Sequence, residues 1–582
     1  MRRLRPLLRP MAAALLIGLA LVAEATAAPY AGDFPWREWS DQVFEQAARE
    51  KKFVLVSLQS WWCPWCHVMN RETYDDPGVR KYLLEHFIPV RVDQDSRPDI
   101  SQRYERWGWP ATIIFGPDGT EIVKLRGFYS PQFFMPVLVE TVKDPSPVDY
   151  GTRGGPERAR TLTRSLTEAQ RAEIRAFIDQ SYDAVNGGWG KSKLVDAPTL
   201  TWALDRAKDG DRAIEPQIRK TMERLPELVH PATGAVSQVS LKPDWSAPAP
   251  EFPMFAQEAA LKAFAQAYAL WGDPRFKAAG SKVARFLTGT MAAPDGGFYA
   301  SLGLGEGNPG VDRRQYAREN GQAIAGLLAW YDATGDEAAL RAALRATDWV
   351  LANRALPGGG FRHADKDAAG PYLADNVEMG KALLALHRST GDRRWLSEAR
   401  ATADVIARTF VDAGTGGFIA AASPDAKHLA KPVKQREDNV SAVRFFNLLH
   451  FYTGEAKYRE IAEAGMGYLT SPPILDAYGF LPDVLQAEAE MLQEPVHLTV
   501  VGAKDDPRAA ALVRAGLAYP LQHKRVEWWD KREGPLPHPD VNYPDYPGGP
   551  AAFACTRNFC SLPVTDPSAV APQLDRLQRA VQ

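Results

Sequence analysis

The sequence predicts a multidomain protein in which an α/β domain precedes an all-α toroid of paired helices, with a small α/β segment at the end. Three observations predict this order. A C-x-x-C motif follows a buried strand near the front, two kinds of glycine turn alternate through the middle, and short apolar strands return near the end. The length of 582 residues suggests three or four domains of about 150 residues each.

The overall composition is that of a globular protein. Hydrophobic residues make up 45% and charged residues 24% of the chain, which excludes wholesale disorder. The formal net charge is −2, so no basic excess exists to neutralise phosphates and nucleic acid is not expected as a partner. The 4 cysteines are too few for a disulfide-built scaffold, and their role must therefore be local.

Residues 1–28 have the pattern of a secretory signal peptide, with a basic head, the apolar run 11–22 and a small-residue cleavage site at 25–27. The arginines of the head are Arg2, Arg3, Arg5 and Arg9. A membrane anchor is the alternative, but a span needs about 20 apolar residues and this run is shorter. We expect a secreted or periplasmic protein without a stable membrane anchor after leader removal, whose thiols meet an oxidising compartment.

The front domain is expected over residues 29–146. Its elements alternate between helical and extended patterns. In order they are a helix at 40–51, a strand at 53–58, a helix beginning near Pro64, a helix at 79–86, and strands at 87–92, 109–115 and 121–126, followed by a helix at 131–143. A C-x-x-C motif between the first strand and the next helix of such a series is the thioredoxin-like pattern.

Cys63 and Cys66 are the candidate catalytic residues, in the run Cys63-Pro64-Trp65-Cys66. Pro64 suits the first position of a helix, which places Cys63 at the helix N-terminus. Unpaired backbone N–H groups and the helix dipole stabilise a thiolate there. Cys66, one turn further on, is placed to resolve a mixed disulfide formed on Cys63. The motif thus predicts a redox-active dithiol that needs no cofactor.

Other roles for this motif remain open at this stage. With His67 it matches the haem-attachment pattern C-x-x-C-H, which export would permit, but the strand before it and the Trp-Pro strand downstream have no role in a haem site. Two isolated cysteines also lack enough ligands for structural zinc, so no metal is expected. A permanently oxidised, inert disulfide is the remaining alternative.

The motifs of the front domain together resemble the spermatogenesis-associated protein 20 family. They are Trp62–Met69, the charged run 92–99, and Gly108-Trp109-Pro110 with the strand that follows. The resemblance implies a thioredoxin-like domain followed by a toroid resembling six-hairpin glycosidases, and a cis peptide before Pro110 beside the cysteines. Trp62, His67 and Pro110 are accordingly expected to support the dithiol.

This sequence departs from the related patterns at two positions. Pro64 stands where the family usually has His, which can change the redox poise. Ser57 stands where thioredoxins carry a buried carboxylate, so the usual proton acceptor for the resolving thiol is missing. His67 is either a partial substitute for it or a solvated helix residue. The charged residues between 93 and 99 are expected to form a solvated loop with an aspartate helix cap.

Residues 147–164 are rich in Pro, Gly and Arg and read as a linker, and 165–494 contain a repeat of about 60 residues. Glycine turns that are mostly followed by an aromatic residue fall at Gly188, Gly297, Gly360, Gly417 and Gly479, with Gly234 as a degenerate sixth. Glycine–acid turns lie between them at Gly210, Gly272, Gly335, Gly391 and Gly454. An open solenoid and a closed (α/α)6 toroid both fit; six helix pairs, each with one long loop, favour the toroid.

An acidic residue recurs in register within this repeat, at Glu319, Asp375 and Asp438, each followed by Asn. Helix capping is one interpretation. The other is a carboxylate cluster that binds or hydrolyses sugar, which for a glycosidase requires one protonated and one ionised carboxyl group about 5–10 Å apart. His363 is a further candidate for this toroid ligand site.

The tail, residues 495–582, is predicted to contain a strand at 497–501, a helix at 507–518 and a strand at 525–529. Cys555 and Cys560 follow, and a local disulfide is expected in an oxidising compartment. They are alternatively a relay partner for Cys63 and Cys66, or free thiols.

The leading functional hypothesis is an exported thiol–disulfide oxidoreductase fused to a toroid that binds a client or a glycan. Its partners would be a protein thiol or disulfide client and, with the toroid, a carbohydrate. A second hypothesis places the main chemistry in the toroid, as a carbohydrate hydrolase or epimerase with an accessory thioredoxin domain. A third is a binding protein without turnover, in which Cys63 and Cys66 stay oxidised.

Overall fold

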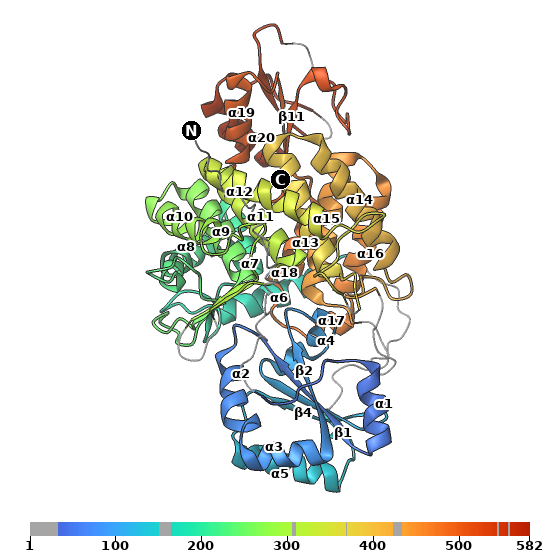
Figure 1. Cartoon of the computed structure of the whole chain (residues 1–582). Coiled ribbons are helices and arrows are strands. Elements are labelled where there is room, and N and C mark those ends of the chain that lie inside the picture. The colour runs from blue at the N-terminus through green and yellow to red at the C-terminus, as the bar shows by residue number, and fades with distance from the viewer. Residues whose placement is uncertain are drawn as a thin grey trace, which may run out of the picture.

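The computed structural model describes residues 33–581 except 151–163, 305–309, 368, 423–432, 544–545 and 557–558. The expected leader, and most of the expected linker, lie outside the described residues. Three bodies follow one another along the chain: a front α/β domain, a ring of helices, and a C-terminal α/β domain at the opposite end of the ring (Figure 1). In the described part, no helix is long and apolar enough to cross a bilayer.

The front domain contains a four-stranded sheet in the order β2-β1-β3-β4. Its strands are β1 (Phe53–Gln59), β2 (Phe87–Asp93), β3 (Ala111–Phe115) and β4 (Glu121–Arg126). β1 runs parallel to β2 and antiparallel to β3, and β4 is antiparallel to β3. Both faces of β1 are buried, which explains why its sequence is a continuous apolar run rather than an alternating one.

Helices cover both faces of this sheet. α3 (Pro77–His86) and α5 (Pro131–Lys143) share one apolar cluster with Leu55, on one face of β1. α1 (Asp41–Glu50) and the segment 98–107, which includes α4 (Pro98–Ser101), cover the neighbouring side chains of β1 on the other face. The short helix α2 (Pro64–Met69) carries the cysteine motif. The thioredoxin-like fold predicted for the front of the chain is confirmed.

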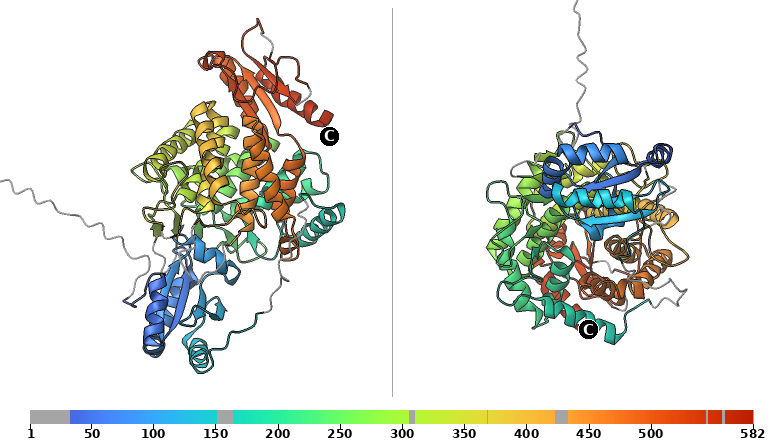
Figure 2. Two further views of the ribbon diagram at one scale, coloured as in Figure 1. Left: turned by 90° about the vertical axis from the view of Figure 1, so that its right-hand side faces the viewer. Right: turned by 90° about the horizontal axis from the view of Figure 1, so that it is seen from below.

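In the described part of residues 165–494, twelve helices form the toroid, disregarding the single-turn helix α17 (Pro472–Leu475). Six inner helices contact one another in a closed ring: α7 (Ala197–Lys208), α9 (Met254–Trp271), α11 (Ala317–Thr334), α13 (Leu373–Thr390), α15 (Arg436–Thr453) and α18 (Pro482–Leu492). Their outer partners are α8 (Ile214–Arg224), α10 (Pro274–Thr288), α12 (Glu337–Asn353), α14 (Arg393–Thr409), α16 (Ala456–Leu469) and α6 (Glu168–Ser181). The closed toroid is confirmed, and its sixth pair joins α6 and α18 from the two ends of the repeat (Figure 2).

The two kinds of glycine turn have separate structural causes. At the ends of four inner helices glycine is left-handed, as at Gly335 (φ 72°) and Gly391 (φ 70°), a conformation that a Cβ disfavours. The aspartate that follows caps the next helix, as Asp336 does for α12. At the other ends, an asparagine side chain bonds both backbone groups of the aromatic residue, as Asn376 does at Phe361.

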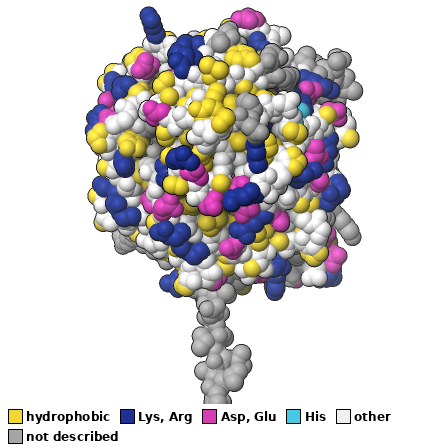
Figure 3. Space-filling model, turned by 90° about the horizontal axis from the view of Figure 1, so that it is seen from above, with side chains coloured by type: hydrophobic (Ala, Val, Ile, Leu, Met, Phe, Trp, Pro, Cys, Tyr) yellow, Lys and Arg dark blue, Asp and Glu magenta, His cyan; other side chains and the backbone are white. Residues whose placement is uncertain are grey.

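The C-terminal domain has a three-stranded sheet in the order β11-β10-β12, with strands β10 (Val496–Val501), β11 (Lys524–Trp529) and β12 (Ala551–Cys555). Helices α19 (Pro507–Leu517) and α20 (Val570–Val581) pack on it. β12 and α20 are absent from the sequence prediction, because the prolines and glycines of 535–550 conceal a strand that follows them. Figure 3 shows this end of the molecule, with acidic and basic side chains interspersed among apolar ones.

Candidate functional site

The front domain lies over one mouth of the toroid (Figure 2). Hydrogen bonds across this interface join, among others, Trp61 to the carbonyl of Gly310, Arg314 to Asp93, Tyr372 to Asp99 and Gln102 to Asp438. The toroid residues among them come from loops and helix starts at the same end of the ring. This is the face on which the long loops of a helix-pair repeat gather.

Cys63 and Cys66 form a disulfide at the start of α2. Cys63 is the N-cap residue, Pro64 occupies the first turn, and the backbone N–H of Cys66 donates to Cys63 Sγ at 3.2 Å. Both cysteines are buried, with Cys63 only 3% exposed, and they pack against Trp62 and Trp109. The Trp109–Pro110 peptide is cis, as the family resemblance implies.

His67 is a buried residue of α2, so of its two interpretations the solvated helix residue is wrong. Its Nε2 lies 2.8 Å from the carbonyl oxygen of Trp61 and donates to it, because a carbonyl can only accept. Burial lowers the pKa of His67. The side chain is therefore a neutral imidazole that fixes the loop before the cysteines.

The charged run 93–99 is also placed differently from the prediction, since it lies in the domain interface rather than in a solvated loop. Asp93 and Asp99 are buried, and Asp93 accepts a hydrogen bond from Arg314 of the toroid at 2.8 Å. The Asp95 carboxyl accepts from Trp62 Nε1 at 3.1 Å, and burial, followed by the charge of Asp93, raises its pKa. The run connects the loop that carries the cysteine motif to the toroid.

His363 and Asp375, two of the predicted toroid residues, form a buried ion pair beneath the front domain. His363 Nδ1 lies 2.9 Å from Asp375, and Nε2 donates to the carbonyl of Asp95 at 2.5 Å. Burial opposes the charged imidazole, but Asp375 raises the pKa of His363 to about 9. The pair holds the two domains together and does not line the cavity described below.

The three acidic residues in register do not cap their own helices, so the capping interpretation is wrong. The N-caps of these helices are Tyr316, Tyr372 and Gln435, without side-chain caps. Asp375 instead accepts from the backbone N–H of Arg318 on the neighbouring inner helix, at 2.8 Å. Glu319 is buried, and burial raises its pKa.

A cavity of about 580 Å³ runs along the axis of the toroid between residues of all six inner helices. Side chains of the front domain close one end: Trp62, Gln102, Glu105 and Trp109. Gln522 and His523, next to β11, lie at the other end. Leu194 and Phe255 line the cavity and are 56% and 37% exposed, so the cavity reaches the surface beside them. Of the predicted toroid residues, Asp438 lines it.

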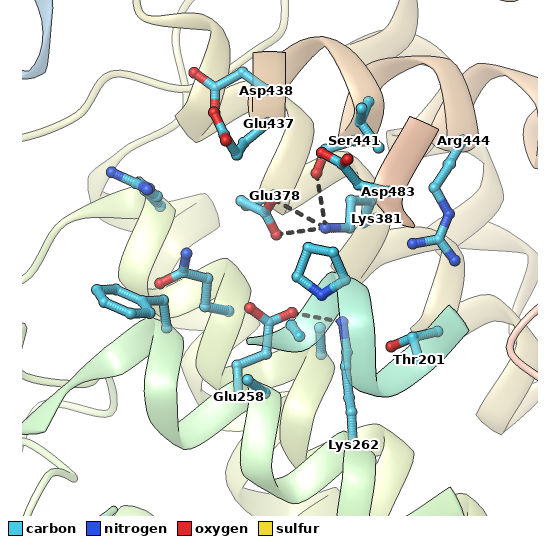
Figure 4. A pocket seen from close by; sticks show the side chains of 18 of the residues that line it. Thr201, Glu258, Lys262, Glu378, Lys381, Glu437, Asp438, Ser441, Arg444 and Asp483 are labelled. Atoms are coloured by element: carbon cyan, nitrogen blue, oxygen red, sulfur yellow. Dashed lines mark hydrogen bonds and ion pairs between the residues drawn. The ribbon is translucent and has the colours of Figure 1, made fainter. Parts of the chain in front are cut away.

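Ion pairs on neighbouring inner helices form much of the cavity wall (Figure 4). Glu258 and Lys262 lie 2.5 Å apart on α9, Glu378 and Lys381 lie 2.9 Å apart on α13, and Arg444 binds Glu490 at 2.7 Å. Burial lowers the pKa of Lys262. Sequence reasoning missed these residues. The available signal was charge at helical spacing in inner helices that are otherwise apolar, as in 254–271.

Three charged groups at the front-domain end of the cavity are less fully paired. The Arg318 guanidinium makes no hydrogen bond or ion pair with another described residue, and it lies in the field of Glu319, Asp438 and Glu378. Asp438 accepts one hydrogen bond, from Gln102 at 3.1 Å, and burial raises its pKa to about 6. Burial, followed by the nearby acids of α15, raises the pKa of Glu105 to about 7.

Comparison with protein families gives two matches in the order of the observed domains. Residues 30–140 match a thioredoxin DsbH model described as a protein of unknown function, DUF255. Residues 218–467 match the catalytic domain of GH127 β-L-arabinofuranosidase. Among the described residues no group of three or more His, Cys, Asp or Glu side chains is arranged to hold a metal ion.

Spermatogenesis-associated protein 20 of Homo sapiens is 23% identical over 303 residues, which is 46% of this chain and 38% of that protein. The Mus musculus protein is 23% identical over 309 residues, with the same coverage. The chain thus aligns with well under half of the length of these relatives. A solved D-mannose isomerase is 13% identical with a TM-score of 0.47, covering 58% of this chain and 99% of that one. The chain is thus similar to the spermatogenesis-associated protein 20 family over about half of its length, and it carries a thioredoxin-like domain followed by a glycosidase-like helical toroid.

Proposed function

We propose that the protein is a thiol–disulfide oxidoreductase with Cys63 and Cys66 as its redox pair. The observation that carries the proposal is the placement of Cys63 at the N-cap of α2, bonded to Cys66 one turn later and beside the cis peptide at Pro110. Export to the periplasm or outside the cell, expected from the leader, is part of the proposal, since a dithiol that cycles with clients meets oxidants there.

The geometry supports an exchange that starts on Cys63. In the reduced protein the thiolate at this N-cap receives the backbone N–H of Cys66 and the positive end of the helix dipole. The thiolate attacks one sulfur of a client disulfide and releases the other as a thiolate. Cys66 then attacks Cys63 Sγ, which restores the intramolecular disulfide and releases the client as a thiol.

The test is to trap the intermediate. A Cys66→Ala variant lacks the resolving thiol, so a client remains attached to Cys63 and is identified by mass spectrometry after an acid quench. Cys63→Ser/Cys66→Ala is the matched control and should carry nothing. An unlinked Cys63 in the Cys66→Ala protein, under conditions in which the client disulfide is present, would overturn the proposal.

A second candidate function is carbohydrate binding or turnover in the toroid. It is favoured by the GH127 match over 218–467 together with the two glutamates, Glu258 and Glu378, which point into the cavity (Figure 4). The test is hydrolysis of an aryl β-L-arabinofuranoside, and stabilisation of the protein by oligosaccharides. Glu378→Gln should abolish both effects and Glu460→Gln, on an exposed face, should abolish neither. Equal results in the two variants would rule the toroid site out.

A further inference from the structure

We infer that the client of the dithiol is a low-molecular-weight thiol or disulfide carrying both carboxylate and ammonium groups, which binds in the cavity between the front domain and the toroid. This inference rests on the proposed oxidoreductase activity and specifies its substrate class. Three features of the described residues carry it: the burial of the dithiol, the position of the cavity, and the charges at its end.

The burial of the dithiol excludes a large client. Cys63 is 3% exposed and Cys66 is fully buried, whereas a protein disulfide must place its own backbone beside the attacking sulfur. The part of the front domain next to Pro110 faces the toroid, as Trp109 lines the cavity. The hydrogen bonds and ion pairs of the interface hold this arrangement, including the buried contact between His363 and Asp95. A folded protein would reach Cys63 only if the two domains separated.

The cavity lies directly beyond the two indoles that cover the cysteines. Trp62 and Trp109 pack against Cys63 and Cys66, and both also line the cavity. Its volume of about 580 Å³ is within the range of roughly 300–1,000 Å³ found for small-molecule sites. Trp62 is held by one hydrogen bond, to Asp95, so a local side-chain rotation gives a bound sulfur compound access to Cys63.

The charges at the front-domain end of the cavity indicate the chemical class of the ligand. The deeper cations Lys262, Lys381 and Arg444 are each paired with a glutamate, so they offer no uncompensated charge. Arg318 makes no such bond to the described residues and faces the cavity, where a ligand carboxylate would satisfy its planar donors. Asp438 and Glu105 lie nearby and would bind an ammonium group. A neutral sugar would leave the guanidinium donors of Arg318 without a carboxylate bonded directly to them.

The exchange balances without a further reagent, because the structure holds the oxidised form. One ligand thiolate attacks the Cys63–Cys66 bond at Cys63 and releases Cys66 as a thiolate that takes up a proton. A second ligand thiolate attacks the ligand sulfur of the mixed disulfide and releases Cys63. Two ligand thiols become one disulfide and the protein disulfide becomes a dithiol. The reverse direction reduces a ligand disulfide by the same steps.

The experiment compares three disulfide probes with the reduced full-length protein: glutathione disulfide, which carries both charges, hydroxyethyl disulfide, which carries neither, and insulin. The rate of reaction with each probe is measured as the rate at which the disulfide between Cys63 and Cys66 forms again. We expect Arg318→Gln to raise the KM for glutathione disulfide about tenfold, equivalent to ~1.4 kcal/mol, and to leave the rate with hydroxyethyl disulfide unchanged. Arg318→Lys should restore part of the affinity. Arg394→Gln, on an exposed helix face, is the matched control.

The outcomes separate the two levels of the argument. If the wild-type protein reacts with none of the probes, the oxidoreductase proposal fails and the inference fails with it. If hydroxyethyl disulfide reacts but Arg318→Gln leaves the glutathione disulfide kinetics unchanged, the activity stands and the inferred ligand class is wrong. Insulin reacting as fast as glutathione disulfide would likewise overturn the inference, because it would show that the toroid does not restrict access.

Discussion

The α/β domains at the two ends of the toroid share one strand arrangement and differ in chemistry. In the front domain β1 lies between the parallel strand β2 and the antiparallel strand β3. In the C-terminal domain β10 lies in the same way between the parallel β11 and the antiparallel β12. Each central strand is followed by a helix whose first residue is proline, Pro64 in α2 and Pro507 in α19. A proline also precedes the antiparallel strand in both domains, as Pro110 and Pro550.

The reactive positions, in contrast, are not shared. Asp506 occupies the N-cap position of α19 that Cys63 occupies in α2, and its side chain accepts the N–H of Arg508. Among the described residues the peptides before Pro110 and Pro371 are cis, whereas the peptide before Pro550 is not. The same strand arrangement therefore carries a disulfide at a helix start at one end and an ordinary helix cap at the other. Function follows the residues of the site, not the fold.

The second disulfide, Cys555–Cys560, lies at the end of β12 and not at a helix start. Figure 1 shows the C-terminal domain and the front domain on opposite sides of the toroid. The alternative in which these cysteines relay electrons to Cys63 and Cys66 therefore has no path within one folded chain. We assign a structural role to the pair.

The sharpest test of this contrast removes one cysteine at each end. Cys63→Ser should lower the rate of disulfide exchange by roughly 1,000-fold or more, as loss of a nucleophile does in other enzymes. Cys555→Ser should leave the rate unchanged, because its domain lacks a cysteine at the helix N-cap. The measurement is exchange with a chromogenic disulfide. Equal losses in both variants would show that the second pair takes part in turnover.

Removing the Cys555–Cys560 disulfide should lower the stability of the C-terminal domain by a measurable amount. Cys555→Ser/Cys560→Ser opens a loop of about six residues, which lowers the free energy of unfolding by about 2 kcal/mol in the chain-entropy model. Hydrogen exchange of the β10 amides should report the loss, and amides of β1 should not respond. Unchanged protection of β10 would contradict the assignment.

Asp506, the helix cap at the position that corresponds to Cys63, contributes less to stability than the Cys555–Cys560 disulfide. Asp506→Ala removes the hydrogen bond to the first turn of α19 and should destabilise the C-terminal domain by about 1 kcal/mol. Asp506→Ser keeps a capping oxygen and should retain most of that stability. Chemical denaturation, monitored by hydrogen exchange of the α19 amides, measures the stability of each variant. Equal stabilities for Asp506→Ala and Asp506→Ser would show that the cap does not contribute.

The smallest effect concerns pH at the front interface. Burial raises the pKa of Asp438 to about 6, so its contribution to stability is complete below about pH 4 and is lost as the pH rises through 6. Because the cavity reaches solvent, screening reduces the effect to about 1 kcal/mol or less. Asp438→Asn should flatten the dependence of Tm on pH between 4 and 7, while Glu460→Gln should not. An unchanged slope in Asp438→Asn would place the titration elsewhere.

Local patterns allowed the sequence to predict much of the architecture. The apolar run 53–58 predicts a strand and the proline at position 64 predicts a helix start. Both elements are determined by residues that are close together in the sequence. The alternating glycine turns predict twelve helices in six pairs because each glycine ends a helix locally. The strand 551–555 was not predicted, since its identity depends on pairing with the distant β10.

The candidate site was predictable only in part, for the same physical reason. Cys63 and Cys66 are three positions apart in the sequence, so their motif is visible without knowledge of the fold. His363 and Asp375 were both candidates from the sequence. The hydrogen bond from His363 to Asp95 was not predictable, because it depends on how the two domains pack together. Arg318 was not predicted as a site residue, because an arginine in a helix is ordinary until the folded ring makes it line the same cavity as Trp62.

The pairing of α6 with α18 has a consequence for biosynthesis. Arg171 and the N–H of Leu166 bind Glu488, a partner 317 and 322 residues further along the chain. A ribosome therefore releases the front domain and five helix pairs before the ring can close. During that interval Arg171 and the N–H of Leu166 lack the carboxylate that Glu488 later supplies, so α6 cannot complete its pair until α18 has been made.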